Sequence, residues 1–386
     1  ERFLQGKTTS IQADLAREMA AAAEAMEYER AAALRDRIKA LTAVQSVQAI
    51  NPRGVAEADV IALHMEGGQA CVQVFFIRGN QSWGNRDFYP KLNGVESADE
   101  VMQAFLAQFY DGKVPPRMLL LSHGIEDPDL MTEALSEKAG RKVALGVPRR
   151  GEKAELVENA LRNARESLAR RMSESAAQAR LHLDNCQLCP HRCGPARASG
   201  RGVCRVDTRT FIASEMLHLG EEEAIRPAHA VFFAACTATC TFCTAARFAF
   251  RPQYGVEATP AQLAAVVRRR RAQGARTLEF VGGDPLPHLP FVLATLALLG
   301  AEAPPVVWNS NFYHTPEALS LLDGVVALYL PDLKFGNDRC GLELGGMPDY
   351  WAVVTGAIAW AAARSPLLVR HLLMPGHFDC CTKPVL

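Results

Sequence analysis

The sequence has no excess charge of either sign, since 42 lysines and arginines balance 42 aspartates and glutamates. A chain without net charge has no overall electrostatic attraction for nucleic acid, so any binding of nucleic acid would have to come from a local patch. Long apolar runs are also missing. The longest, near residues 291–299 and 351–363, are too short to cross a bilayer, and no signal peptide opens the chain. We therefore expect a soluble, cytoplasmic protein with no membrane partner.

A disulfide framework is not expected either, although the chain has 11 cysteines. Most of them gather in two short motifs, which is typical of metal binding in a reducing compartment. At 386 residues the chain is long enough for two or three domains with their own cores. It begins at Glu1 without a methionine and stops at Leu386 in mid-pattern, which suggests a fragment.

Three cysteines stand close together at Cys236, Cys240 and Cys243. Three thiolates on one short loop can each bind one iron of a cubane iron–sulfur cluster, which usually has four cysteine ligands. One iron is then left open for a substrate or cofactor. The alternatives are a zinc knuckle, or buried thiols that pack as small apolar side chains. Zinc sites usually pair C-x2-C units, and three cysteines in eight residues are too dense for packing alone.

This spacing resembles that of the radical S-adenosylmethionine (SAM) enzymes, and residues 185–386 resemble the pyruvate formate-lyase activating enzyme-like proteins. The resemblance implies a [4Fe-4S] cluster on the three cysteines, with SAM chelated at the open iron. It implies a radical SAM oxidoreductase that cleaves SAM reductively to a 5′-deoxyadenosyl radical, which abstracts a hydrogen atom. The implied partners are a flavodoxin- or ferredoxin-like reductant and an unidentified protein or small-molecule substrate.

A second group holds four cysteines in nineteen residues: Cys186, Cys189, Cys193 and Cys204. Four thiolates in a glycine-rich loop can complete a tetrahedral shell around zinc, or hold a second iron–sulfur cluster, and the spacing leaves both open. His191 could replace one thiolate, but we expect it to be a surface residue. Cys71 is expected to be a core thiol, Cys340 has no assigned role, and Cys380 and Cys381 are expected to be core or substrate-side thiols.

Strand and helix patterns alternate from residue 230 onward. Strands are predicted at 230–235, 277–281, 305–309, 325–330 and 367–373, with helices beginning at Thr259-Pro260, Phe291, Thr315-Pro316 and Tyr350. Threonine before proline marks a helix N-cap and first turn. Five strands with four crossover helices predict an α/β fold with a parallel sheet, curved into an open barrel. The resemblance implies a partial (β/α)6 radical SAM barrel whose last unit is truncated.

Polar and glycine residues follow the predicted strands, where barrels of this kind place their chemistry. The resemblance implies SAM contacts at Gly282, Gly283, Asp284, Asn309, Asp332, Lys334 and Arg370, and no catalytic residue beyond the cluster. Asp284 departs from the family, which has glutamate there, so its carboxylate reaches one methylene less far. Asn311 could equally cap the next turn. An ordinary glycine turn at residues 282–283 and a surface ion pair at residues 332–334 are the alternatives.

The first half of the chain resembles another family. Residues 14–41 predict a helical hairpin similar to the UVR motif in the C component of excinuclease ABC, which implies pairing with the B component. A strand hairpin at 59–76, helices at 98–110 and 152–172, and a strand at 118–121 match the region just before that family's RNase H-like nuclease. The match stops near Leu181, ahead of the family's catalytic aspartates, so we expect no nuclease activity.

These observations predict four segments. They are a UVR-like hairpin (1–50), an excinuclease-like α+β region without nuclease residues (51–180), a four-cysteine segment (181–229) and a radical SAM partial barrel (230–386). A radical SAM enzyme is the leading interpretation. The alternatives are a nucleotide-excision-repair module that binds the B component of excinuclease ABC, and an inactive fusion of both halves.

Overall fold

The structure is a computed structural model, and it describes residues 34, 55–66, 69–90, 92, 97–220 and 222–386. Apart from residue 34, the hairpin predicted at residues 14–41 lies outside these residues. The chain divides into two compact units. The first comprises residues 1–62, 73–86 and 106–162, and the second comprises residues 63–72, 87–105 and 163–386. Residues 181–229 and 230–386 therefore belong to one unit.

The first half of the chain contains a five-stranded sheet in the order β3-β2-β1-β4-β5. Its strands are β1 (Glu57–Glu66), β2 (Gln69–Arg78), β3 (Gln81–Phe88), β4 (Met118–Leu121) and β5 (Ala144–Gly146), and its helices are α3 (Ala98–Phe109), α4 (Pro128–Ala139) and α5 (Glu152–Asp184). β1, β4 and β5 run parallel. The predicted hairpin strands and the strand at 118–121 are confirmed. β3, β5 and α4 were missed, because β3 is largely polar and exposed and β5 has only three residues.

A buried carboxylate lies within β1 of the first unit. Asp59 is only 2% exposed. One of its oxygens accepts a hydrogen bond from Arg78 Nη1 at 2.8 Å, and the other accepts one from the Tyr110 hydroxyl at 2.6 Å. A buried charge is tolerated when it is paired and hydrogen-bonded in this way. Protein groups thus engage both oxygens of Asp59.

The second half contains a seven-stranded sheet in the order β12-β11-β10-β9-β7-β6-β8. Its strands are β6 (Thr210–His218), β7 (Ala228–Phe233), β8 (Val256–Ala258), β9 (Thr277–Gly282), β10 (Val306–Ser310), β11 (Leu328–Leu333) and β12 (Arg370–His371). Neighbouring strands from β7 to β12 pair in parallel, which confirms the five predicted strands. β12 is shorter than the predicted 367–373. β6 and β8 were missed, and they add an antiparallel edge beside β7.

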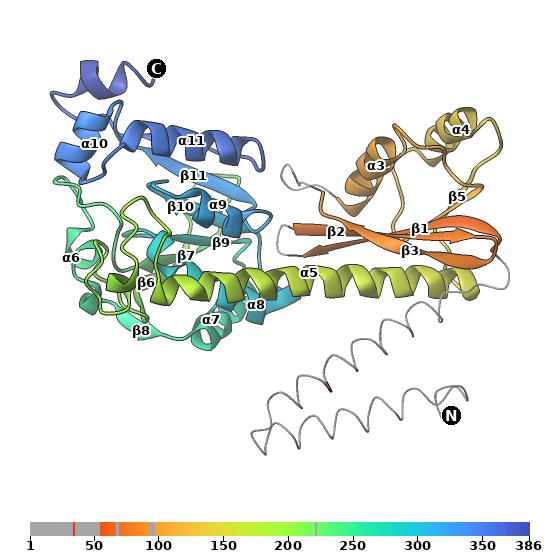
Figure 1. The fold of residues 1–386 in the computed structure, drawn as a ribbon, viewed down its shortest axis with the longest axis horizontal. Coiled ribbons are helices and arrows are strands. Elements are labelled where there is room, and N and C mark those ends of the chain that lie inside the picture. Colours follow the sequence, from red (N-terminus) through yellow and green to blue (C-terminus); the bar gives the residue numbers. More distant parts are fainter. Residues whose placement is uncertain (1–33, 35–54, 67–68, 91, 93–96, 221) are drawn as a thin grey trace. The chain divides into compact units, whose positions relative to one another are not determined.

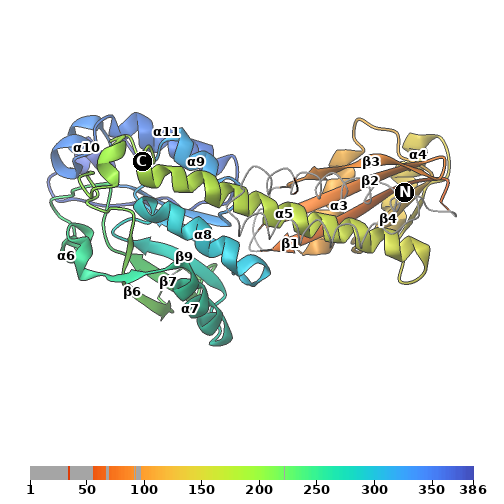
Figure 2. The same cartoon turned by 60° about the horizontal axis from the view of Figure 1, so that its bottom comes forward.

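Helices alternate with the parallel strands as expected. They are α7 (Pro260–Ala272), α8 (Leu289–Leu299), α9 (Pro316–Leu322) and α11 (Tyr350–Ala362), and the sequence did not predict α6 (Ala246–Ala249) or α10 (Asp338–Gly345). Figures 1 and 2 show α7 and α8 beside β7 and β9, and Figure 1 shows α11 beside β11. Short turns of helix are η1 (Pro195–Arg197), η2 (Pro252–Tyr254), η3 (Leu286–His288), η4 (Gly300–Glu302) and a final π-helical turn, η5 (Phe378–Thr382).

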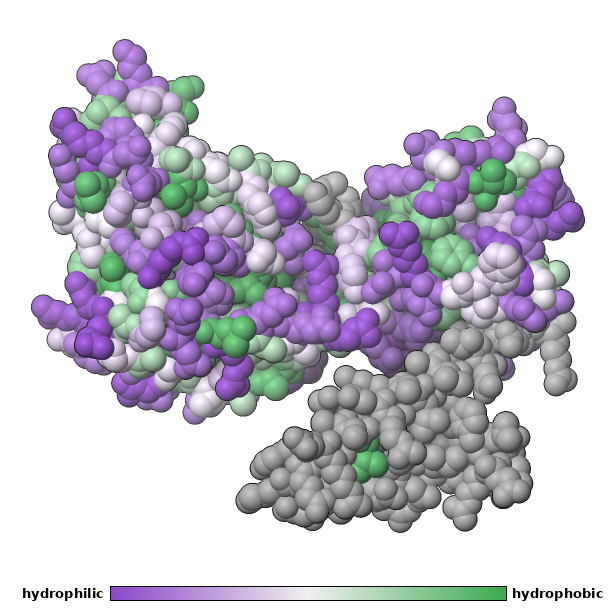
Figure 3. All heavy atoms as spheres, viewed as in Figure 1, coloured by the Kyte–Doolittle hydropathy of each residue, from purple (hydrophilic) through white to green (hydrophobic). Residues whose placement is uncertain are grey.

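One apolar core joins these helices to the sheet. Buried side chains of α7, α8, α9 and α11 pack with those of β7, β9, β10 and β11 in a single cluster. The face shown in Figure 3 is mainly hydrophilic, with scattered apolar side chains between. Among the described residues, no helix combines the length and the apolar character needed to cross a membrane. The packing of the four helices against the sheet holds the parallel strands in place. It therefore also fixes the position of their carboxyl ends, where the candidate functional site lies.

The capping box of α7 yields a testable prediction. The Thr259 hydroxyl accepts a hydrogen bond from Gln262 N, and Gln262 Oε1 accepts one from Thr259 N at 2.8 Å. Thr259→Ala removes one of these bonds, so we expect a loss of about 1 kcal/mol in the free energy of unfolding, measured with urea. Thr208→Ala, at an exposed position, is the control and should change it by less than about 0.5 kcal/mol. Equal effects in the two variants would contradict the prediction.

Candidate functional site

A cavity of about 550 Å³ lies at the carboxyl ends of the parallel strands. That volume is within the range of ligand pockets, roughly 300–1,000 Å³. Its lining includes Cys236, Cys240, Cys243, Gly282, Gly283, Asn309, Asp332, Lys334 and Arg370. The structure thus brings together the three cysteines of the loop and all of the predicted SAM contacts except Asp284.

The cysteine loop, residues 236–243, follows β7 and is held by α10. The backbone N–H groups of Thr239 and Thr241 donate to the carbonyl oxygens of Gly345 and Leu344 at 2.8 and 2.9 Å. These carbonyls belong to the last turn of α10, where helical partners are missing. Gly346 follows with φ +66, and a Cβ there would overlap the Thr239 hydroxyl. The position of the loop therefore depends on a helix that the sequence did not predict.

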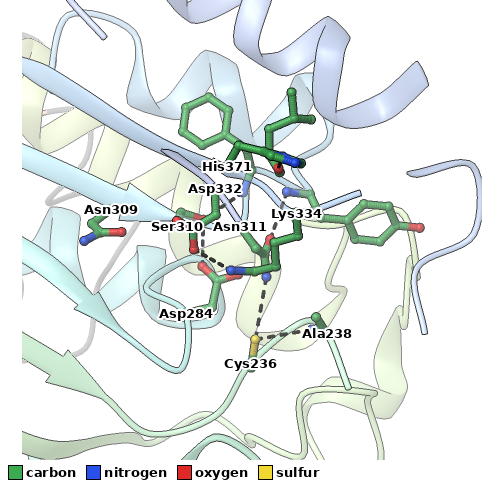
Figure 4. A network of polar contacts seen from close by, with 12 residues as sticks. Cys236, Ala238, Asp284, Asn309, Ser310, Asn311, Asp332, Lys334 and His371 are labelled. Carbon is green, nitrogen blue, oxygen red and sulfur yellow. Dashed lines mark hydrogen bonds and ion pairs between the residues drawn. The ribbon is translucent and has the colours of Figure 1, made fainter. Parts of the chain in front are cut away.

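Asp284 lies behind the cavity wall and is 1% exposed. Its Oδ1 accepts hydrogen bonds from Ser310 Oγ at 2.8 Å and Leu286 N at 3.1 Å, and its Oδ2 accepts one from Thr237 Oγ1 at 2.9 Å. Burial raises the pKa of Asp284 to about 6. Figure 4 shows Asp284 below Ser310 and Asn311. In the structure both oxygens of Asp284 therefore accept hydrogen bonds from protein groups, whereas the sequence predicted that this carboxylate contacts SAM.

Asn311 is the asparagine that lies against the cysteine loop. Its Nδ2 donates to Thr237 Oγ1 at 3.0 Å and lies 3.6 Å from Cys236 Sγ, while its Oδ1 accepts a bond from Tyr313 N. The Asn311 side chain points toward Cys236 in Figure 4. It caps the next turn, as the sequence allowed, and it also contacts the first cysteine. Asn309 lines the cavity, and its Nδ2 donates to Glu279 Oε1 at 2.8 Å.

Two ion pairs supply the charges of the cavity wall. Lys334 Nζ lies 2.5 Å from Asp332 Oδ2. Burial lowers the pKa of the Lys334 ammonium group, but the Asp332 carboxylate, together with the Cys240 and Cys236 thiols, raises it above its ordinary value. Arg370 binds both carboxylate oxygens of Glu222, with Nη2 to Oε2 at 2.7 Å. The sequence did not single out Glu222, which precedes the sheet's first parallel strand.

The three thiols of the loop are not gathered as the ligands of a single ion would be. All are free of disulfides. Among the described residues, the groups of ligand atoms that lie within 4.8 Å of one another do not include these three sulfurs together. Ligands that each bind a different iron are spread in this way, whereas ligands of one ion are not. Burial raises the pKa of Cys240 to about 11, with Lys334 opposing the shift, and a bound metal would instead deprotonate the thiol.

The four-cysteine segment contains a buried cation, Arg197. Its thiols are those of Cys186, Cys189, Cys193 and Cys204. Burial raises the pKa of Cys189, and the neighbouring thiols of the group add to the effect. Arg197 is 2% exposed, donates to the Asp207 and Pro287 carbonyls at 2.8 and 2.7 Å, and lies 3.9 Å from Cys186 Sγ. A buried cation beside these thiols suits an anionic thiolate centre. Among the described residues, however, no three of these four sulfurs lie within 4.8 Å of one another, so they are not arranged as the ligands of a single zinc ion.

His191 does not lie on the surface as the sequence predicted. It is half-buried, its Nε2 lies 2.9 Å from the Thr237 carbonyl oxygen, and its ring meets the edge of Tyr313. Thr315, the N-cap of α9, also donates its backbone N–H to the Leu188 carbonyl at 3.1 Å. The four-cysteine segment is thus tied to the cysteine loop and to α9.

Comparisons with known families give separate matches for separate parts of the chain. Residues 230–385 match the model of the radical SAM superfamily. Residues 9–43 match the UvrB/uvrC motif, and residues 57–171 match the UvrC ribonuclease H-like domain. The two halves resemble two different families. The resemblances to the radical SAM enzymes and to the C component of excinuclease ABC are confirmed. The region placed just ahead of an RNase H-like nuclease, however, matches a model that is itself named for an RNase H-like domain.

Curated relatives match the first half of the chain. UvrABC system protein C of Cereibacter sphaeroides is 75% identical over 181 residues, which cover 47% of this chain and 29% of the relative. The Ruegeria pomeroyi protein of that name is 74% identical over 181 residues, with the same coverage. The chain therefore spans less than a third of these relatives. Among solved structures, Streptococcus suis SuiB covers 84% of this chain, and this chain covers 57% of SuiB, at 13% identity and a TM-score of 0.32, too low to carry an argument.

Gly283 provides a test of the cavity wall. A Cβ at this position would overlap the carbonyl oxygen of Ala235, just ahead of the cysteine loop. The backbone of Gly283→Ala would have to move, so we expect a loss of about 1–3 kcal/mol in the free energy of unfolding, measured with urea. Gly356→Ala is the matched control, since a Cβ there meets nothing within 4 Å and Gly356 lies inside α11. That variant should be stabilised by about 0.5–1 kcal/mol. Unchanged stability in Gly283→Ala would contradict the tight approach.

Proposed function

We propose that the second half of the chain is a radical SAM enzyme of the pyruvate formate-lyase activating enzyme-like type, with a [4Fe-4S] cluster on Cys236, Cys240 and Cys243. The observation that carries the proposal is the cavity in which these cysteines meet the polar ends of the parallel strands. The radical SAM match of residues 230–385 supports the general class. When bound, the cluster and SAM would supply one-electron cleavage of SAM to a 5′-deoxyadenosyl radical and hydrogen abstraction.

The residues of the cavity would bind and orient SAM. Gly282 and Gly283 line the cavity. They also let the backbone lie close to Phe233 and Ala235, because a side chain at either position would overlap those residues. The amide of Asn309 and the carboxylate of Asp332 offer hydrogen bonds to the ribose, and Lys334 offers a cation to the carboxylate of SAM. Asp284 acts as a positioning residue through Thr237 and Ser310.

Arg370 would contribute in a different way from the sequence prediction, which gave it a direct role in orienting SAM. Its guanidinium is already bound to both oxygens of Glu222. Such a pair holds its geometry well, because two parallel hydrogen bonds fix the planar groups. We propose that the pair stiffens this side of the cavity, while Leu372, Leu373 and Met374 line it and exclude water. The proposal includes a flavodoxin- or ferredoxin-like reductant and a cytoplasmic location.

Cys240→Ala tests the cluster assignment. After anaerobic reconstitution with iron and sulfide, the unchanged protein should convert SAM to 5′-deoxyadenosine once reduced, and its reduced-cluster EPR signal should change on adding SAM. We expect Cys240→Ala to lose this product to background, because one iron loses its ligand. Cys71→Ala, which removes a buried thiol of β2 far along the chain, is the control and should keep the activity. A Cys240→Ala protein that still forms 5′-deoxyadenosine would refute the assignment.

A second candidate function is supported by the first half. We propose that residues 14–41 bind the B component of excinuclease ABC, on the basis of the UvrB/uvrC motif match at 9–43 and the identity to UvrABC system protein C. Nuclease activity is not part of this proposal. Asp59 is the buried carboxylate of β1, and its oxygens are engaged by Arg78 and Tyr110, which suits it to holding the sheet together rather than to binding a metal.

A pull-down with purified UvrB, the B component of excinuclease ABC, tests the binding module. The full chain should retain UvrB at micromolar concentrations, and a chain lacking residues 9–43 should lose this binding. The cluster variant Cys240→Ala should still bind, because its substitution lies outside the motif. Failure of the full chain to bind would remove the second candidate. Failure in both this assay and the SAM assay would leave the inactive fusion.

A further inference from the structure

Four side chains with metal-binding atoms meet outside the three cysteines of the cavity. They are Cys340, His377, Cys380 and Cys381, and their ligand atoms all lie within 4.8 Å of one another. Cys340 is in the first turn of α10, His377 precedes η5, and Cys380 and Cys381 belong to η5. Residues near the end of the chain thus return to a helix some forty positions earlier.

Four of the six distances within this group match those around one tetrahedral ion, and the other two are within 4.8 Å. Cys340 Sγ lies 3.8 Å from Cys380 Sγ and 3.7 Å from His377 Nδ1. Cys380 Sγ lies 3.4 Å from His377 Nδ1 and 3.8 Å from Cys381 Sγ. With zinc bond lengths of about 2.3 Å to sulfur and 2.0 Å to nitrogen, a tetrahedron has edges of about 3.8 Å between sulfurs and about 3.5 Å between sulfur and nitrogen.

Contacts that need no metal hold the two segments together. Asn337, the N-cap of α10, accepts a bond from Cys340 N at 2.8 Å and donates to the Cys380 carbonyl at 2.6 Å. A Cβ at Gly336 would come within 2.5 Å of the Cys381 carbonyl oxygen, so glycine permits this close approach. His371 Nε2 lies 3.1 Å from the Thr382 hydroxyl. The ligand atoms are therefore positioned by the fold.

We propose that Cys340, His377, Cys380 and Cys381 form a structural site for one divalent ion, zinc in the first place. Three thiolates and one imidazole are a typical closed zinc shell, with no position left for a substrate. The sequence suggested instead that Cys380 and Cys381 are core or substrate-side thiols, since adjacent cysteines do not suit a cluster with one iron each. Two adjacent cysteines can both bind one ion, and the sulfurs of Cys380 and Cys381 lie 3.8 Å apart, as two ligands of one ion would.

A disulfide is the main chemical alternative for the group. The thiols are free in the structure, and 3.8 Å between sulfurs is well beyond the bond length of about 2.0 Å. The group also differs from the cysteine loop, whose sulfurs are not gathered within the same limit. The ion would fasten the segment after β12 to α10, and residues 372–375 of that segment line the cavity.

Zinc content distinguishes the proposal from four reduced thiols. The full chain, expressed with zinc and analysed by mass spectrometry of the metal, should hold one more zinc per chain than Cys380→Ser. Cys380 is exposed, so this substitution leaves the core intact. Cys380→His should keep the ion, because imidazole also binds zinc, and Cys71→Ser should match the unchanged protein. The comparison is a difference, so zinc bound at Cys186, Cys189, Cys193 and Cys204 cancels. Equal zinc in Cys380→Ser and the unchanged chain would overturn the proposal.

Alkylation provides an independent readout without SAM or a cluster. Cys380 should react slowly with iodoacetamide in the zinc-loaded chain and at least several-fold faster after a chelator is added, as mapped by peptide mass spectrometry. The exposed thiol would otherwise be open to the reagent at all times. Equal rates before and after chelation, or a Cys340–Cys380 disulfide in protein purified without oxygen, would contradict a metal site. Neither measurement depends on the proposed SAM chemistry.

Discussion

The buried carboxylate of Asp284 is the contact on which the cavity depends. It joins the cysteine loop through Thr237, the end of β10 through Ser310, and its own turn through Leu286 N. A carboxylate that is 1% exposed can stay in the interior only because each oxygen accepts hydrogen bonds. Removing one partner would leave part of that charge unsatisfied, at a cost of a few kcal/mol. The three strand-end segments are therefore held as one unit before any ligand binds.

Two ion pairs also fix the positions of side chains around the cavity. Lys334 is fixed by Asp332, and Arg370 is fixed by Glu222, so both cations have defined directions. The Lys334 backbone N–H also donates to the Tyr350 hydroxyl at 2.7 Å, which connects the end of β11 to α11. Pre-set charges lose little entropy when a ligand arrives, which is the usual advantage of an organised site. This geometry is consistent with a cavity built to orient a charged, polar molecule.

Much of the second half could be predicted from the sequence, because its signals are local. Apolar runs marked the five parallel strands, and Thr-Pro pairs marked the starts of α7 and α9. Short or polar elements such as β5, β8 and α10 gave no such signal. The hydrogen bonds of Asp284 could not be predicted for a different reason: whether a carboxylate faces a cavity or the core depends on partners such as Thr237, which lies 47 residues away. The grouping of Cys340 with His377, Cys380 and Cys381 could not be predicted for the same reason, because these residues come from segments far apart in the sequence.

Helix α10 connects two of the cysteine groups of this half, the cysteine loop and the group of Cys340, His377, Cys380 and Cys381. It has eight residues, so its ends are only about 12 Å apart. Its first turn carries Cys340, and its last carbonyls hold the cysteine loop. Two glycines keep it tightly packed, because a Cβ at Gly341 would meet Tyr350 and one at Gly345 would meet Phe335. A helix packed this closely cannot absorb a shift at one end by bending, since protein interiors have few voids. Fixing Cys340 with an ion would therefore also restrict the loop that bears Cys236, Cys240 and Cys243.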